Sequence, residues 1–302
     1  MTAFPLWAER LYNTPVALAQ HKNDALCEFA EMRISGKSSL PERIGVGSLE
    51  GVQMRAMSDE ASFYNEDGRK PFQFKGSIAV IPMRGTLVHR ADWMDAESGL
   101  CGYNRLLKQF RAARDDRDIK GIFVPTNSGG GECAGMFAAA EEIAAMAKAE
   151  GGKPIYVYLD EQACSAAYVL ASAGDKVLGR RECIGGSIAA LMNMIDKSKA
   201  YEKVGLEPHV VRASWADRKA IGTGGEKFDA ELLTKMGSLV EEISEQIVEF
   251  VAAMRHVPVK ALKSLRGEVF SGRDLLKYGL IDDIVSEQEA WAMLEEEIDQ
   301  AA

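Results

Sequence analysis

Three short runs rich in β-branched and aromatic residues recur along the middle of the chain, at Ile78–Pro82, Ile119–Pro125 and Pro154–Leu159. Two segments of helical character separate them. Tyr103–Arg114 has apolar residues at helical spacing, and Ala134–Ala149 is rich in alanine, the strongest helix former. Strand–helix–strand alternation at this spacing favours right-handed βαβ units and a mostly parallel, covered sheet. The sequence therefore predicts an α/β fold.

The pattern continues toward the C-terminus. Two further strands are predicted at Ile188–Met194 and His209–Arg212. A long helix is predicted over Asp229–Met254, because its apolar side chains recur at helical spacing. We assign all of these elements to one domain over residues 76–286.

The two ends of the chain are predicted to lie outside this domain. Residues 1–75 form an N-terminal arm with a predicted helix over Asn23–Met32. Residues 36–72 mix glycine, serine, proline and charge, and end in the polar run SDEASFYNEDGRKP at 58–71, a predicted linker whose few apolar side chains offer little burial to offset the entropy of ordering. We interpret the arm as a docking extension. Residues 287–302 form an acidic helical tail whose glutamates are expected to face solvent.

Composition excludes several classes of function. The net charge of -9 offers no basic footprint for nucleic acid. No apolar run approaches the roughly 18–20 residues that span a bilayer, and the first residues lack the basic start and apolar stretch of a secretory signal. The five cysteines have no CxxC spacing and the four histidines are isolated, so we expect reduced thiols, no metal and no cofactor.

Ser165 is the candidate nucleophile. It follows the strand Pro154–Leu159 and lies among small residues, at the start of a predicted helix. A turn of this kind exposes a serine Oγ and directs backbone N–H groups at its surroundings. Many ordinary strand–helix junctions have the same composition, so this stretch needs partners elsewhere in the chain. The neighbouring Cys164 is a rival nucleophile without an evident base, and we interpret it as a small buried thiol.

A glycine-rich loop, Thr126–Gly131, follows the strand Ile119–Pro125. It lacks the Lys-Ser/Thr of a P-loop and the spacing of a dinucleotide-binding loop, which argues against nucleotide binding. Its backbone amides are better suited to an oxyanion hole, where fixed donors stabilise the charge that develops on a carbonyl oxygen. A tight turn is the structural alternative, and it explains one glycine more easily than three.

A serine nucleophile needs a base, and no histidine is suitably placed. A lysine serves where burial lowers its pKa enough to populate the neutral amine. The candidate is Lys219, in a loop directly after the predicted strand His209–Arg212. Composition alone would favour a surface salt bridge for this residue. The adjacent Arg218 cannot be the base, because a guanidinium does not deprotonate in proteins.

Five motifs together resemble the signal peptide peptidase A family of serine proteases, and within it the prohead proteases of bacteriophages. They are NSGGGECAG at 127–135, ACSAAYVLASAGDKV at 163–177, IGGSIAALMNMID at 184–196, the Lys219 loop, and VFSGRDLLKYGLIDDIV at 269–285. The opening LYNTPVALAQHK at 11–22 is also similar to the phage members. The resemblance implies a crotonase-like fold, shared with the caseinolytic protease, and a Ser–Lys dyad without metal or cofactor.

Position by position, the resemblance implies a role for each site residue. Ser165 matches the nucleophile and Lys219 the general base. Ser187 matches a serine that orients the lysine amine, although a turn serine that caps its own backbone is an equal alternative. Gly130 and Ala166 match the two oxyanion donors.

Two departures from the family pattern affect these assignments. Gly129 stands where the family often has proline, so Gly129 or Gly131 remains an alternative donor to Gly130. The match of Lys219 relies on an ungapped reading of the loop that contains it.

The resemblance also implies a substrate class: the scaffold, capsid or portal proteins of an assembling prohead in the host cytoplasm, and the protease itself by autocleavage. It implies a homo-oligomer, because crotonase-like folds commonly form rings. Three alternatives stay open. They are a bacterial signal-peptide-degrading peptidase, an acyl-CoA enzyme for which Glu132 would lack a second carboxylate, and a catalytically silent scaffold protein.

Overall fold

The computed structural model describes residues 14–20, 23, 70–91 and 99–301. The strands are β1 (Val16–Leu18), β2 (Gln73–Lys75), β3 (Ile78–Val80), β4 (Met83–Arg84), β5 (Thr86–Val88), β6 (Leu100–Gly102), β7 (Gly121–Ser128), β8 (Gly130–Glu132), β9 (Ile155–Cys164), β10 (Lys176–Gly179), β11 (Ile184–Gly186), β12 (Val269–Ser271) and β13 (Asp283–Ile284). The helices are α5 (Tyr103–Asp115), α6 (Met136–Ala144), the 3-10 helix η3 (Lys148–Glu150), α7 (Ala166–Ser172), α8 (Ser198–Lys203), α9 (Ala230–Arg255), α10 (Val259–Ser264), α11 (Gly272–Lys277) and α12 (Glu287–Ala301). Most of the helix predicted over Asn23–Met32 and most of the predicted linker lie outside the described residues.

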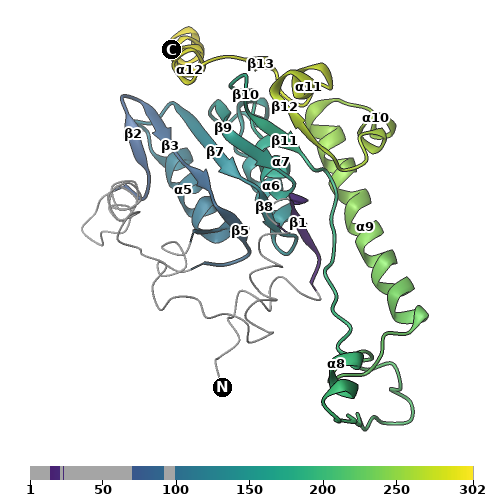
Figure 1. Ribbon diagram of the computed structural model, residues 1–302. Coiled ribbons are helices and arrows are strands. Elements are labelled where there is room, and N and C mark those ends of the chain that lie inside the picture. The colour runs from purple at the N-terminus through teal and green to yellow at the C-terminus, as the bar shows by residue number, and fades with distance from the viewer. Residues whose placement is uncertain (1–13, 21–22, 24–69, 92–98, 302) are drawn as a thin grey trace, which may run out of the picture.

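A mainly parallel sheet forms the centre of the molecule (Figure 1). Its strands follow the order β12-β11-β9-β7-β3-β2, and β9 is long enough to pair with β10 along its first half and with β11 along its second. Only the two ends of this path, β2 and β12, pair antiparallel with their neighbours. The predicted α/β fold with parallel βαβ units is therefore confirmed.

Alternating side chains along the central strands supply two separate cores. Ile122 of β7 and Val157 of β9 pack with α5, α6, α7 and the C-terminal half of α9, whereas Phe123 and Tyr156 face the opposite side and pack against α12. This is the expected consequence of the two-residue period of a strand, with both faces of a parallel sheet covered.

A second, smaller sheet has the order β1-β8-β5-β6. The glycine strand β8 lies in its interior, parallel to β5 and antiparallel to β1. The N-terminal segment therefore becomes an integral strand beside the glycine loop, although the sequence pattern did not predict a strand there.

Helix α9 extends well beyond the body of the molecule (Figure 1). Its 26 residues correspond to about 39 Å, yet its buried side chains, Ile247, Val248 and Val251, all belong to its C-terminal half. At the far end, the Asp229 carboxylate caps the helix by accepting from the Leu232 amide at 2.7 Å. The segment before this cap, which includes α8, lies at that same far end.

Both strands predicted after Ser165 are wrong. No strand forms at Ile188–Met194: β11 ends at Gly186, and beyond it Leu191 makes an isolated bridge to Val16. The segment His209–Arg212 is irregular, because it projects into solvent and none of the described strands pairs with it, and Val211 is 94% exposed. An apolar β-branched run forms a strand only where another strand completes its hydrogen bonds.

One ion pair fastens α9 to the sheet. The nearly buried Arg255 donates to both carboxylate oxygens of Asp282 at 2.6 and 3.2 Å, and Asp282 also accepts from the Val177 amide of β10 at 2.7 Å. We expect Arg255→Met to lower the free energy of unfolding by about 1–3 kcal/mol, because Asp282 loses a charged partner at the edge of the core. Urea denaturation measures this loss.

Lys263→Met is the matched control. Lys263 pairs with Glu245 on the exposed side of α9, where an ion pair contributes less than about 1 kcal/mol. Equal losses in the two variants would show that the Arg255 pair does not fasten the helix.

Candidate functional site

Ser165 lies in a sharp turn between β9 and α7. Its backbone has φ 55° and ψ −122°, a conformation that non-glycine residues rarely adopt. The Ser165 amide donates to the Gly186 carbonyl at 2.8 Å, and its Oγ donates to the Ala189 carbonyl at 3.3 Å. The side chain is only 1% exposed. The turn therefore holds the hydroxyl in a fixed, enclosed position.

Ser187 follows the neighbouring strand in the same way. It comes directly after β11, has φ 53°, and donates its amide to the Glu268 carbonyl at 2.8 Å. Ser187 is 9% exposed, and within the described part of the chain its hydroxyl has no hydrogen-bond partner. Two serines with positive φ thus occupy corresponding positions after adjacent parallel strands, β9 and β11.

The glycine strand packs directly against the Ser165 turn. A Cβ on Gly130 would lie 3.1 Å from the Ala166 nitrogen and 2.9 Å from the Cys164 carbonyl oxygen, so the Gly130 backbone is in close contact with this turn. Ala166 is the first residue of α7, and its N–H has no acceptor within the helix. The structure therefore brings Ser165, Ser187, Gly130 and Ala166 together.

The amide of Gly130 already has a partner. It donates to Ser128 Oγ at 3.2 Å, and the Ser128 hydroxyl donates in turn to the Gly85 carbonyl at 2.6 Å. Gly131, one of the alternative donors, is paired with Ala17 on one side and Leu87 on the other. Ser128 was not predicted as a site residue, although its place two residues before Gly130 is typical of a side chain that fixes a glycine turn.

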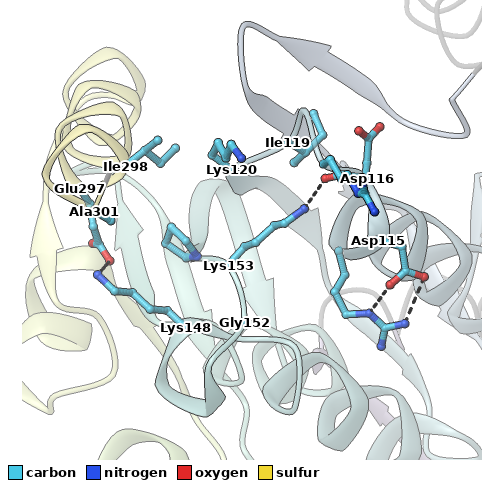
Figure 2. A pocket seen from close by; sticks show the side chains of 13 residues that line it. Asp115, Asp116, Ile119, Lys120, Lys148, Gly152, Lys153, Glu297, Ile298 and Ala301 are labelled. Atoms are coloured by element: carbon cyan, nitrogen blue, oxygen red, sulfur yellow. Dashed lines mark hydrogen bonds and ion pairs between the residues drawn. The ribbon is translucent and has the colours of Figure 1, made fainter.

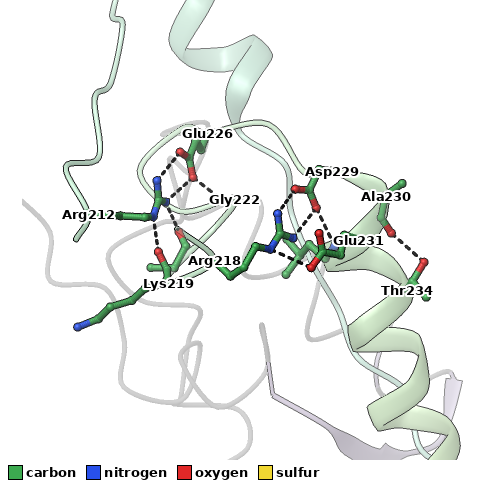
Figure 3. Close-up of polar contacts among 11 residues, drawn as sticks. Arg212, Arg218, Lys219, Gly222, Glu226, Asp229, Ala230, Glu231 and Thr234 are labelled. Atoms are coloured by element: carbon green, nitrogen blue, oxygen red, sulfur yellow. Dashed lines mark hydrogen bonds and ion pairs between the residues drawn. The ribbon is translucent and has the colours of Figure 1, made fainter. Parts of the chain in front are cut away.

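Lys219 is not part of this cluster within one chain. It lies in the exposed segment at the far end of α9, and its side chain points away from the surrounding contacts (Figure 3). Two arginine–carboxylate contacts fold this segment: Arg212 binds Glu226 at 2.6 and 2.8 Å, and Arg218 binds Asp229 at 2.7 and 3.0 Å. Arg212 also donates to the Lys219 carbonyl. Within the described residues, the Lys219 Nζ has no ion-pair partner.

Cys164 is unsuited to the role of rival nucleophile. Its side chain is fully buried, and this burial raises the pKa of the thiol to about 12, with a smaller contribution from Cys183. The thiol therefore stays protonated at neutral pH, whereas the thiolate is the reactive form of cysteine. This agrees with its interpretation as a small core residue.

A pocket of about 750 Å³ opens at the other end of the sheet (Figure 2). It lies at the start of β9, about 30 Å along that ten-residue strand from Ser165. Several of its charged groups have partners: Lys148 pairs with Glu297, and Lys153 donates to the carbonyls of Ala113 in α5 and of Asp116 just after it, at 2.8 and 2.6 Å. Burial lowers the pKa of Lys153. These contacts join the segment from η3 to the start of β9 with the end of α5 and with α12, and the pocket is separate from the serine cluster.

The chain is thus an α/β protein with a mainly parallel sheet. Its candidate site is a buried serine at a strand-to-helix turn, with glycine backbone packed against it. The model of peptidase family S49 matches residues 147–301, which include both Ser165 and Lys219. The chain belongs to peptidase family S49. In the described part of the chain, no helix has the length and apolar character needed to cross a membrane.

Relatives of two kinds are similar to the chain. It is 27% identical over 265 residues to the head-tail preconnector protein GP5 of Enterobacteria phage P21, covering 85% of the chain and 52% of that relative. It is also 27% identical over 267 residues to the capsid assembly protease C of Escherichia phage lambda, covering 87% of the chain and 59% of that relative. A putative signal peptide peptidase SppA of Enterococcus faecium is 26% identical over 197 residues, 65% of the chain and 56% of the relative. The chain thus spans between about half and three fifths of the length of these relatives.

The close contact at Gly130 predicts that the site does not accept a side chain there. Gly130 has φ 102°, and a Cβ would lie 2.2 Å from the Ala17 carbonyl oxygen. We expect Gly130→Ala to lower the free energy of unfolding by about 2–4 kcal/mol, because backbone strain and the clash add together. Gly151→Ala is the matched control: Gly151 has φ 82°, but no heavy atom lies within 4 Å of its Cβ position, so only the strain of about 1–2 kcal/mol remains. Equal losses in urea denaturation would contradict the close packing of β8.

Proposed function

We propose that the chain is a serine endopeptidase with Ser165 as the nucleophile and Lys219 as the general base. One observation carries this proposal. Ser165 and Ser187 directly follow the adjacent parallel strands β9 and β11, and the Gly130 backbone packs against the Ser165 turn. Family S49 membership supports peptide hydrolysis as the reaction.

In the proposed mechanism, the neutral Lys219 amine takes the Ser165 proton, and Oγ attacks the carbonyl carbon of the substrate peptide. The N–H of Ala166, with that of Gly130 once it leaves Ser128 Oγ, stabilises the tetrahedral oxyanion. Lys219, oriented by the Ser187 hydroxyl, gives the proton to the leaving amine, and water then hydrolyses the acyl-enzyme.

A second copy of the chain supplies Lys219 in this proposal. The projecting part of the chain, which we define as residues 204–239, has seven of the eleven exposed large hydrophobic side chains among the described residues: Val204, Leu206, Val210, Val211, Trp215, Leu233 and Leu239. Such a concentration of apolar surface is typical of an interface. Contact with a second chain would remove water from around the amine, and burial favours the neutral form of lysine that a general base requires. The same contact would therefore complete the dyad and cover the apolar surface.

We propose proteins of an assembling phage capsid as the substrates, including scaffold and portal proteins and the chain itself. The names of the two phage relatives, a capsid assembly protease and a head-tail preconnector protein, support this substrate class. Both alignments extend over more than four fifths of the chain, whereas that with the putative signal peptide peptidase covers 65%. The assembling head inside the host is the corresponding place of action.

Mixing two inactive variants tests whether the dyad forms between copies. We expect Ser165→Ala and Lys219→Ala each to abolish cleavage of an unfolded reporter protein. A refolded one-to-one mixture should regain roughly a quarter of the wild-type rate, because half of the sites keep the serine and half of those meet an intact lysine. Cleavage is followed by gel electrophoresis.

Lys235→Ala is the control in the same projecting part, and it should retain the wild-type rate because Lys235 belongs to the exposed stretch of α9. A mixture as inactive as its components would contradict a dyad formed between copies. A wild-type chain that leaves both the reporter and co-expressed capsid proteins intact would contradict the peptidase proposal itself.

A further inference from the structure

Strand β1 occupies a position directly beside the candidate nucleophile. On one side it pairs antiparallel with the glycine strand β8, with Ala17 opposite Gly131, and the Ala19 amide donates to the Gly129 carbonyl at 2.8 Å. On its other side, Val16 and Leu191 exchange two backbone hydrogen bonds of 2.9 Å. The segment is therefore an extended peptide held along both edges.

The residues that neighbour β1 lie close to Ser165. Val16 and Leu191 form an isolated bridge, and Ala189, two residues before Leu191, is the residue whose carbonyl accepts the hydrogen bond from Ser165 Oγ. On the β8 side, the Cβ position of Gly130 lies 2.2 Å from the Ala17 carbonyl oxygen and 3.1 Å from the Ala166 nitrogen. The backbone of β1 thus lies between β8, whose Gly130 packs against the Ser165 turn, and the segment that contains the acceptor of the serine hydroxyl.

This arrangement covers the nucleophile. Ser165 is 1% exposed, and all residues from Val16 to Ala19 are buried. Another extended peptide cannot take the place between β8 and Leu191 while β1 remains in it. The glycine strand and the segment around Leu191, in contrast, already present the backbone donors and acceptors that an extended peptide requires.

We propose that the space between β8 and Leu191 is the substrate groove, that it binds extended peptides antiparallel to β8, and that β1 is the segment of this chain that fills it at rest. The inference rests on the proposed function and adds the mode of substrate binding. A substrate strand replaces β1 and makes the same hydrogen bonds with Gly129, Gly131 and Leu191.

The side chains of β1 indicate which peptides fit. Ala17 and Ala19 lie on the same face of the strand, because side chains alternate with a period of two, and both are completely buried. Leu18 lies on the opposite face. The groove therefore favours peptides with small side chains at two alternate positions and an apolar side chain between them.

A pair of asparagines fastens the segment in place. The Asn23 side chain donates to Asn193 Oδ1 at 3.3 Å, and the Asn193 side chain donates back to Asn23 Oδ1 at 2.6 Å. We call this pair of hydrogen bonds the Asn23–Asn193 clasp. Asn193 belongs to the same segment as Leu191, so the clasp joins the N-terminal segment to one wall of the groove. Neither amide belongs to the proposed catalytic groups.

A reversible cross-link tests whether β1 must leave. The double variant Val16→Cys with Leu191→Cys places two thiols on a hydrogen-bonded antiparallel pair, where Cα atoms lie about 5.5 Å apart, within the range of a disulfide. We expect the oxidised variant to cleave an unfolded reporter protein at least about tenfold more slowly than the same variant after reduction, because the groove stays filled. Wild-type protein under the same oxidation and the single variant Val16→Cys are the controls.

Equal rates in the oxidised and reduced double variant would overturn the inference while leaving the peptidase proposal intact. A chain without any Ser165-dependent cleavage, reduced or not, would instead contradict the proposed function. Should the double variant not fold, Asn193→Ala provides the second measurement. Weakening the clasp should raise the cleavage rate roughly threefold to tenfold, and an unchanged or lower rate with intact folding would overturn the inference.

A synthetic peptide with the sequence of residues 14–20 tests the ligand class. It should inhibit the Asn193→Ala variant by competing for the groove, whereas the same peptide with Ala17→Pro should not, because proline lacks the N–H that pairs with Gly131. Equal inhibition by the two peptides would contradict strand-like binding.

Discussion

The hydrogen bond from the Ser165 amide to the Gly186 carbonyl is the interaction on which the rest of the site depends. It joins the ends of the parallel strands β9 and β11, and each strand is followed by a serine with positive φ. Such conformations cost of the order of 1–3 kcal/mol each and persist only where the surroundings enforce them. Here every residue of α7 is buried, so the turn cannot relax without disrupting the core.

Packing alone requires glycine at two positions of β8, independently of any catalytic role. At Gly131 a Cβ would lie 1.8 Å from the Leu87 carbonyl oxygen, and at Gly130 it would meet the Ala17 carbonyl and the Ser165 turn. A backbone that runs between two strands and against a helix start has no room for side chains there. The same lack of side chains exposes its amides to any peptide in the position of β1. Close packing and peptide binding thus require the same residues.

The sequence predicted the α/β fold well, because the runs that became β3, β7 and β9 are buried on both faces and α5, α6 and α9 have helical spacing. The grouping of Ser165, Ser187, Gly130 and Ala166 came from the family resemblance, and these residues lie close together in the structure. The strand β1 was not predicted, because its three residues pair with segments that are distant in sequence. The separation of Lys219 from Ser165 could not be predicted from the sequence either. Apolar spacing along α9 does not show that only the C-terminal half of the helix packs on the rest of the protein.

The energetics of β1 favour a segment that is able to leave the groove. Burial of Val16 and Leu18 stabilises the folded segment by about 3–6 kcal/mol, whereas ordering three residues of backbone costs about 3–6 kcal/mol. These contributions nearly cancel, so the backbone pairing and the Asn23–Asn193 clasp decide the balance. A tethered strand still acts at an effective concentration of the order of millimolar. A free peptide competes poorly with it, whereas a protein confined close to the groove competes well, which favours substrates enclosed with the enzyme in one assembly.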